Sequence, residues 1–378
     1  MTKIEWTHRP GTKGERWNPI KARNKKTGSN GHFCIKVSKG CNKCYAANFQ
    51  PRFKNPIRYA KQDADQVELF LDKGRLREPL HWKKPRTAFV CSMTDLFLEL
   101  HPDDWLDQIF AHMALCVGQT FMALTKRPAR AQEYLRSEET TRRIGKIMRS
   151  IDPLATCYMC PDQDGIWPLP NVWLGVSVED QATADERIPI LMNTPAELRF
   201  ISAEPLLGPL QIERWLNIAW QCSGCRGYFS GTWQRTCPDC GKNNYWSGSH
   251  KFNGRNRPKN PIRPPQSGQG LDWVIAGGES GHKANPMHPD WARSLRDQCN
   301  AANVPFFFKQ WGNTAPLLTG EPVINATHHL VAWPDGTVGP GQAKDKGGPG
   351  LQLYRTTKKA AGRELDGTQH NTWPRAAA

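Results

Sequence analysis

Short apolar runs that end abruptly in polar residues recur along the chain. Each run has the length of a strand and is rich in β-branched and aromatic side chains. Six runs occupy residues 88–91, 121–124, 172–176, 198–201, 273–276 and 304–308, and a weaker seventh at residues 32–37 precedes them. Because these runs are apolar throughout rather than alternating, they predict strands that are covered on both faces of a sheet.

Helical patterns lie between several of these runs. Pro102, Asp103 and Asp104 have the proline and the acids of a first helical turn, and apolar residues then recur at helical spacing. Pro289 and Asp290 open a second segment of the same kind. Strands that alternate with helices predict parallel βα units and an α/β fold.

Polar or charged side chains follow nearly every predicted strand. In parallel barrels the catalytic residues lie on the loops after the strands, which meet at one face. The pattern therefore favours a full or partial (β/α) TIM-type barrel over a doubly wound open sheet. For any single residue of this kind, the alternative is a turn or a cap of the following helix.

Two segments depart from the βα pattern. Residues 219–268 contain four cysteines, many Gly, Asn and Pro, and no helical period. We expect them to form an inserted module within a barrel domain made of residues 1–218 and 269–318. Residues 319–378 are expected to form a C-terminal cap or hairpin extension.

The charge and the cysteine content narrow the class of protein. The net charge of the 378-residue chain is +16, from 51 basic and 35 acidic residues. This excess suits a polyanionic partner, most simply nucleic acid, although solubility alone is the other explanation. The chain contains no apolar run of the roughly 18 residues that a membrane span needs, and its N-terminus lacks the apolar core of a signal peptide. We therefore expect a cytoplasmic protein without a membrane partner, in which the 12 cysteines stay reduced.

Four of these cysteines have the spacing of a zinc ribbon. They form two pairs with two residues inside each pair and eleven residues between the pairs: Cys222, Cys225, Cys237 and Cys240. Each pair can bind one side of a tetrahedral Zn²⁺ ion. Such a closed site predicts a structural role, in which metal binding supplies the folding energy of the insert.

A second cysteine group has a different spacing. Cys34, Cys41 and Cys44 lie within eleven residues, and Gly40 precedes the second of them. Three thiolates can hold a 4Fe–4S cluster and leave one iron without a protein ligand. An open iron can chelate the amino and carboxylate groups of S-adenosylmethionine, whose reductive cleavage yields a 5′-deoxyadenosyl radical. The alternatives are a zinc site with His32 as the fourth ligand, and partly buried apolar thiols.

The remaining cysteines carry weaker signals. Cys157 and Cys160 cannot complete a metal site alone; they join other cysteines, form a redox pair or have no special role. Cys91, Cys116 and Cys299 lie in strand or helix patterns and are expected to be buried in the core.

Several sequence blocks resemble a known family. They are residues 17–19, 34–46, 92–97, 124–128, 171–179, 199–209, 277–281 and 306–312. On these blocks the chain resembles a phage-encoded three-cysteine-motif family of unknown function with radical-SAM-like character. That family is distantly similar to radical-SAM enzymes such as spore photoproduct lyase, which repairs a DNA lesion in a partial (β/α) barrel. In the common radical-SAM motif the first two cysteines are three residues apart with an aromatic residue before the last, whereas here six residues separate Cys34 from Cys41 and Lys43 precedes Cys44.

The resemblance implies an enzyme that modifies or repairs a nucleic-acid base or a nucleotide through a 5′-deoxyadenosyl radical. It implies a 4Fe–4S cluster and S-adenosylmethionine as cofactors, a reductase or flavodoxin-type electron donor, and a phage- or prophage-encoded protein in the host cytoplasm. One alternative is a non-catalytic iron–sulfur or zinc protein that binds nucleic acid. Another is a radical enzyme that acts on a small molecule or peptide.

Roles at the predicted face can be assigned by chemistry. We expect a catalytic group of Asp95, Lys126, Glu204 and Lys309, and a cofactor-binding group of Ser177, Glu179, Ser202, Gly277, Gly278 and Glu279. Glu179 or Glu279 can accept hydrogen bonds from the S-adenosylmethionine ammonium or ribose, and Lys126 or Arg127 can pair with its carboxylate or with a substrate phosphate. Gly277 and Gly278 allow close approach of the backbone.

Overall fold

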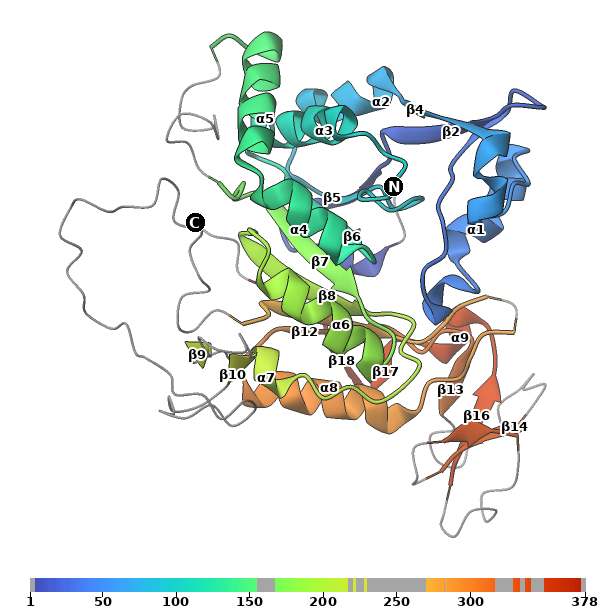
Figure 1. Ribbon diagram of the computed structural model, residues 1–378. Helices are drawn as coiled ribbons and strands as arrows, with labels where there is room; N and C mark the ends of the chain where they lie inside the picture. The colour runs from blue at the N-terminus through green and yellow to red at the C-terminus, as the bar shows by residue number, and fades with distance from the viewer. Residues whose placement is uncertain are drawn as a thin grey trace, which may run out of the picture.

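The computed structural model describes residues 4–154, 167–216, 220–221, 228–229, 270–281, 283–316, 329–333, 337–340 and 350–374. Its centre is a seven-stranded parallel sheet that curls into a half-barrel (Figure 1). In spatial order the strands are β1 (Lys13–Trp17), β5 (Arg86–Val90), β6 (Thr120–Thr125), β7 (Val172–Ser177), β8 (Leu198–Ala203), β11 (Trp273–Gly277) and β12 (Phe306–Gln310).

The strand order excludes the doubly wound alternative. Neighbouring strands follow the chain order from β1 to β12 without a reversal, whereas a doubly wound sheet reverses its order at a switch point. In the part of the chain that the structure describes, no pairing joins β1 to β12. The sheet is therefore open, and all seven strands point their carboxyl ends to one edge.

The six main strand predictions are correct, and the seventh is wrong. Residues 32–37 form a loop, and the first strand of the sheet is β1 instead. Of the five residues of β1, only Gly14 and Trp17 are buried. An edge strand of this kind contains no apolar run, so the hydrophobic pattern could not reveal it.

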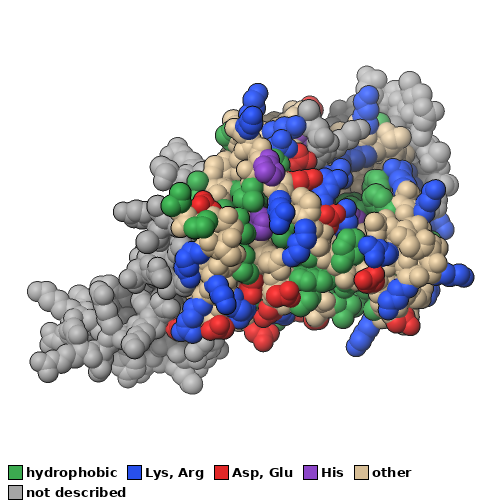
Figure 2. All heavy atoms as spheres, turned by 90° about the horizontal axis from the view of Figure 1, so that it is seen from above, with side chains coloured by type: hydrophobic (Ala, Val, Ile, Leu, Met, Phe, Trp, Pro, Cys, Tyr) green, Lys and Arg blue, Asp and Glu red, His purple; other side chains and the backbone are tan. Residues whose placement is uncertain are grey.

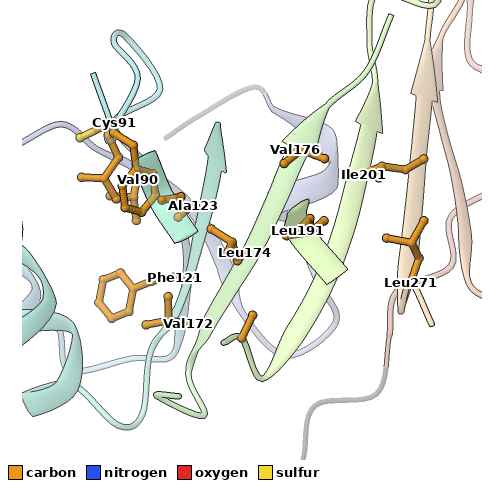
Figure 3. Packing of buried hydrophobic residues seen from close by; sticks show 14 of the residues in the cluster. Val90, Cys91, Phe121, Ala123, Val172, Leu174, Val176, Leu191, Ile201 and Leu271 are labelled. Carbon is orange, nitrogen blue, oxygen red and sulfur yellow. The ribbon is translucent and has the colours of Figure 1, made fainter. Parts of the chain in front are cut away.

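Helices cover the convex face of the sheet. They are α3 (Asp103–Leu115), α4 (Pro128–Arg136), α5 (Glu138–Ile151), α6 (Gln181–Met192) and α8 (Pro289–Ala301). Figure 3 shows how this layer packs: Phe121, Leu174 and Ile201 extend from neighbouring strands, and Leu191 joins them from α6. The predicted helix starts at Pro102 and Pro289 are confirmed, since α3 begins at the residue after Pro102 and α8 begins at Pro289. Cys91, Cys116 and Cys299 are buried in this core, as expected.

A second, largely aromatic cluster fills the concave face. Its members are Trp6, Phe89, Met122, Trp173, Leu198, Phe200, Trp273, Ile275 and Phe307. Gly175 leaves room for this packing, because a Cβ there would lie 2.5 Å from the Phe200 ring. The Trp373 indole donates to the Trp6 carbonyl at 3.0 Å, so two segments far apart in the sequence pack together on the concave face.

A small substructure lies between β1 and β5 in the chain. It contains a three-stranded antiparallel sheet of β2 (Ile20–Asn24), β3 (Asn30–Gly31) and β4 (Val67–Leu71), together with α1 (Tyr45–Phe49) and α2 (Lys73–Arg77). Its 3₁₀ turns are η2 (Lys39–Cys41), η3 (Gln50–Phe53), η4 (Lys61–Gln66) and η5 (Glu78–His81); a further turn, η1 (Glu5–Thr7), precedes β1. Phe33, Ala46, Ile57 and Tyr59 form its core with Met93, which follows β5. This contact attaches the substructure to the edge of the sheet.

The segments before and after the expected insert contact each other. Helix α7 (Glu213–Leu216) precedes the insert, and Leu271 follows it. The Leu271 amide donates to the Trp215 carbonyl of α7 at 2.6 Å. The short strands β9 (Trp220–Gln221) and β10 (Tyr228–Phe229) pair antiparallel. The four cysteines of the expected zinc ribbon lie outside the described residues, as do Cys157 and Cys160.

The C-terminal region adds two further sheets. Strands β13 (Thr314–Pro316), β16 (Leu351–Arg355), β14 (His329–Ala332) and β15 (Val338–Gly339) pair in that order. After α9 (Lys358–Ala361), β17 (Glu364–Leu365) and β18 (Thr368–Gln369) form a hairpin. The Phe308 amide donates to the His370 carbonyl at 2.9 Å, which ties the end of the chain to β12.

Candidate active site

The three cysteines lie on one loop at the carboxyl edge of the sheet. Cys41 ends the turn η2, and Cys44 is the N-cap residue of α1. All three thiols are free and partly buried. Two hydrogen bonds join the loop to the segment after β5: Thr94 Oγ1 donates to the Phe33 carbonyl at 2.6 Å, and the Tyr45 hydroxyl donates to the Ser92 carbonyl.

A buried carboxylate holds the middle of the cysteine loop. Glu179, which follows β7, is 1% exposed. It accepts hydrogen bonds from Ser38 Oγ at 2.8 Å and from the Lys126 ammonium, while Arg187 Nη1 lies 3.2 Å from its second oxygen. A Cβ at Gly40 would lie 2.6 Å from Glu179 Cγ, so only glycine permits this approach.

A second buried carboxylate, Asp95, organises the end of β6. Its oxygens accept from Thr125 Oγ1 at 2.7 Å, from the Lys126 amide at 2.9 Å and from Arg127 Nη1 at 3.3 Å. Arg127 also donates to the Ile35 carbonyl at 2.7 Å, next to Cys34. Asp95 therefore positions the base of the cysteine loop through Arg127.

The surroundings of the three thiols differ. Burial, and then the charge of Asp95, raise the pKa of Cys34 to about 12. Burial also raises the pKa of Cys44. At Cys41 burial acts in the same direction, but the Lys126 ammonium and hydrogen bonds at Ser38 outweigh it and lower the pKa. The Lys126 ammonium therefore favours the thiolate of Cys41, whereas burial disfavours the thiolates of Cys34 and Cys44.

An ion pair lies at the ends of β8 and β12. Lys309 Nζ is 2.7 Å and 2.8 Å from the two oxygens of Glu204, and Gln310 Nε2 donates to the same carboxylate at 3.2 Å. Glu204 and Lys309 keep 17% and 14% of their side-chain surface exposed, so solvent reaches the pair. Lys309 has the same parity along its strand as Phe307, which lies in the concave cluster, so it extends to the concave side.

A third contact crosses the open side of the half-barrel. Lys43 Nζ lies 3.3 Å from Glu279 Oε2, and it donates to Asn285 Oδ1 at 2.9 Å. Glu279 is 6% exposed and also accepts from the Asn285 amide at 2.6 Å. The cysteine loop is thus held by β7 on one side and by the segment after β11 on the other.

Close backbone packing shapes the loops after β11 and β12. A Cβ at Gly278 would lie 2.0 Å from the Trp311 carbonyl, and one at Gly312 would lie 2.0 Å from the Glu279 carbonyl. Gly312 also has φ +83°, which favours glycine. The close backbone approach expected at Gly278 is therefore made to the Trp311 carbonyl of the protein itself. At Gly277 the nearest contact of a Cβ would be 3.4 Å, an ordinary packing distance.

The structure places the candidate residues in three groups. Lys126 and Glu179 lie beside Cys41, and Asp95 lies close to Cys34. Glu204 and Lys309 pair with each other. Ser177 and Ser202 face each other in register at the ends of β7 and β8, where both are buried.

Sequence reasoning missed four residues of the site: Ser38, Lys43, Arg187 and Asn285. Ser38 and Lys43 lie within the three-cysteine motif, which could have pointed to them. Arg187 lies inside α6 and Asn285 in a loop. Neither has a local signal, because only the fold brings them to a carboxylate.

Among the described residues, no group of three or more His, Cys, Asp or Glu side chains is arranged to hold a metal ion. His32, the fourth ligand of the alternative zinc site, has Nδ1 3.2 Å from the Ile20 carbonyl and its ring against Phe53. Burial lowers the pKa of His32 to about 4.

The fold and the site together define an α/β protein with a curled parallel sheet and a cysteine loop at its carboxyl edge. The chain belongs to the family described as "Protein of unknown function (DUF5131)", whose pattern matches residues 1–374. No curated protein matches the chain, and no solved structure does. In the described part of the chain, no helix is long and apolar enough to cross a membrane.

Proposed function

We propose that this protein is a radical-SAM-like iron–sulfur enzyme that modifies or repairs a nucleic-acid base or nucleotide. The observation that carries the proposal is the position of Cys34, Cys41 and Cys44 on one loop at the carboxyl ends of seven parallel strands. In barrels built from parallel βα units, this is the edge at which catalytic residues gather. The partial (β/α) barrel of radical-SAM enzymes is the architecture that the proposal implies for this sheet.

The donor set fits a 4Fe–4S cluster. In such a cluster each thiolate binds a different iron, so the three sulfur atoms need not meet at one point. A zinc ion instead requires all its ligands at about 2.0–2.3 Å from a single centre. Burial raises the pKa of Cys34 and Cys44, and the iron ions of a cluster would stabilise their thiolates.

Bound at such a cluster, S-adenosylmethionine would supply a 5′-deoxyadenosyl radical that abstracts hydrogen from the substrate. The protein's own residues would position and shield this chemistry. The aromatic cluster around Trp6 would exclude water from the concave face of the sheet. The hydrogen bonds among Glu179, Lys126 and Ser38 would hold Cys41 in place. In this proposal Glu179 acts as a positioning residue, beside the cofactor contact expected from the sequence.

The solvent-accessible pair of Glu204 and Lys309 is the best candidate for a substrate or cofactor contact. Among the described residues, the hydrogen bonds of the two side chains join them only to each other and to Gln310. An ammonium or carboxylate of a ligand can replace one partner of such a pair. Ser177 and Ser202 lie in register at the ends of β7 and β8, and Ser202 precedes Glu204 by two residues on the same side of the chain.

Anaerobic reconstitution tests the proposal. Protein loaded with iron and sulfide should turn brown and, with a strong reductant and S-adenosylmethionine, release 5′-deoxyadenosine. Cys41→Ser should lose the brown colour and the cleavage, whereas Cys116→Ala, which changes a core cysteine, should keep both.

A colourless protein that contains zinc and cleaves no S-adenosylmethionine would refute the radical chemistry. That outcome would instead fit the non-catalytic nucleic-acid-binding protein considered from the sequence.

A further inference from the structure

Much of the positive charge is concentrated around the cysteine loop. Residues 18–66 contain eleven Lys and Arg, two Asp and no Glu. These residues include the cysteine loop, α1 and η3. Figure 2 shows Lys and Arg side chains over the right-hand part of the face seen from above, the side on which β2, β4 and α1 lie in Figure 1.

Exposed aromatic side chains lie on the same segment. Tyr45, Phe49 and Phe53 are 43%, 38% and 41% exposed, and they are the exposed large aromatic residues of the described chain. They are four residues apart, and α1 runs directly into η3. Within α1 this spacing places Tyr45 and Phe49 on one side of the helix, and Phe53 follows at the end of η3.

Basic side chains accompany these rings. The Arg52 guanidinium lies over the Phe49 ring at 4.6 Å, and Lys36, Lys39 and Lys54 are exposed nearby in the chain. Lys39 is 79% exposed although its Nζ lies 4.0 Å from Asp180 Oδ2, whereas Arg58 pairs with Asp63 at 2.9 Å. The segment therefore combines exposed rings with cations that remain open to solvent.

We propose that α1 and η3 form a docking surface for single-stranded nucleic acid. Proteins that bind single strands combine a basic surface for the phosphates with aromatic rings on which successive bases stack. In a duplex the bases already stack on each other, so exposed rings favour a single strand. Because α1 begins at the residue after Cys44, a strand on this surface passes the cysteine loop. The inference rests on the proposed function only in making the bound strand a substrate.

Fluorescence anisotropy with a labelled 20-nucleotide oligothymidine tests this surface on the full-length protein. The single strand should bind more tightly than a duplex of the same length. Phe49→Ala with Phe53→Ala should raise Kd at least about 25-fold, since stacking contributes about 1–3 kcal/mol per base and two rings are removed. Phe49→Trp with Phe53→Trp should retain binding, and Leu100→Ala with Val117→Ala, which changes exposed apolar residues elsewhere, should leave Kd unchanged.

Salt dependence tests the basic side chains separately. Arg52→Ala with Lys54→Ala should lower the slope of log K against log salt by about 1.4, since each single-strand phosphate contact contributes about 0.7. The control is Lys83→Ala with Lys84→Ala, which removes two exposed charges between η5 and β5. An equal effect of the control pair, or binding indifferent to the aromatic substitutions, would overturn the proposal.

The outcome is separable from that of the proposed function. Binding is measured on protein with and without a reconstituted cluster. Binding without S-adenosylmethionine cleavage would sustain the docking surface and sink the radical enzyme. Cleavage of S-adenosylmethionine without oligonucleotide binding would support the radical enzyme, overturn the docking surface and indicate another substrate class.

Discussion

At the scale of single residues, the cysteine loop depends on one missing side chain. Gly40 lies against Glu179 Cγ and Oε1, with 2.6 Å to a Cβ placed there. Glu179 cannot move away, because it is 1% exposed and bound to Lys126 and Arg187. Any side chain at position 40 therefore displaces the loop and not the carboxylate.

Gly40→Ala should reduce the iron bound after reconstitution by at least about half while the protein stays folded, since the strain falls on one surface loop. Iron content and the melting temperature measure the two effects. Gly118→Ala is the matched control, because a Cβ there meets nothing within 4 Å. Full iron loading in Gly40→Ala would show that the loop does not need this contact.

At the scale of secondary-structure elements, ion pairs join helices to the ends of strands. Arg187 on α6 donates to the Ser177 carbonyl at 2.7 Å and to Glu179 at 3.2 Å, so it ties α6 to the end of β7. Asp366, between β17 and β18, binds Arg293 and Arg296 of α8. The first pair is buried and the second is partly exposed, so their energetic weights differ.

Arg187→Met should lower the free energy of unfolding by about 3 kcal/mol, because it leaves the Glu179 carboxylate buried with one fewer cation. Urea unfolding followed by tryptophan fluorescence measures the loss. The double variant Arg187→Met with Glu179→Gln should lose less free energy of unfolding than the two single variants lose together. Strict additivity would contradict a direct interaction.

Asp366→Asn should lower the free energy of unfolding by about 0.5–1 kcal/mol at neutral pH. Hydrogen bonds from Arg293, and then from Arg296, lower the pKa of Asp366. A lowered carboxyl pKa stabilises the fold above the unfolded pKa of about 3.9, and this contribution is lost as the pH falls through the folded value. Asn also suits the φ of +55° at this position, so a difference between the two proteins that persists in acid would point to another cause.

At the scale of the whole molecule, the chain leaves and re-enters the sheet domain at one place. The Leu271 amide donates to the Trp215 carbonyl at 2.6 Å, and a Cβ at Gly270 would lie 2.4 Å from the Leu216 carbonyl. Residues 216 and 270 can therefore be joined by a short linker without moving either end. Insertions at such points are tolerated because loop length costs little free energy.

Replacing residues 217–269 with a short Gly-Ser linker should leave the melting temperature within a few degrees of the parent. The variant should lose one equivalent of zinc, since the four cysteines of the expected ribbon are removed, and should still bind iron at the cysteine loop. Metal analysis of both proteins checks this. Aggregation of the variant would show that the segment is part of the sheet domain.

Local patterns were sufficient for six of the seven strands of the central sheet and for the starts of two helices that cover it. Six strands, the starts of α3 and α8, and three core cysteines follow from apolar runs and helix-start residues, because burial on both faces of a sheet demands continuous apolar segments. Polar strand ends also predicted that Lys126, Glu179, Glu204 and Lys309 lie at one edge, since parallel strands end together.

Which of these residues touch each other depends on the folded chain. The partners of Glu179 lie just before η2, just after β6 and within α6. Lys43 and Glu279 are 236 positions apart in the sequence and lie 3.3 Å from each other. Strand β1 is recognisable only by its place beside β5. Contacts of this kind are decided by the curl of the sheet and by the packing of distant segments, which leave no periodic trace in the sequence. The amino-acid pattern therefore specified the strands and the chemistry available at their ends, and the tertiary structure decided which carboxylates hold the cysteine loop and which pair stays open to a ligand.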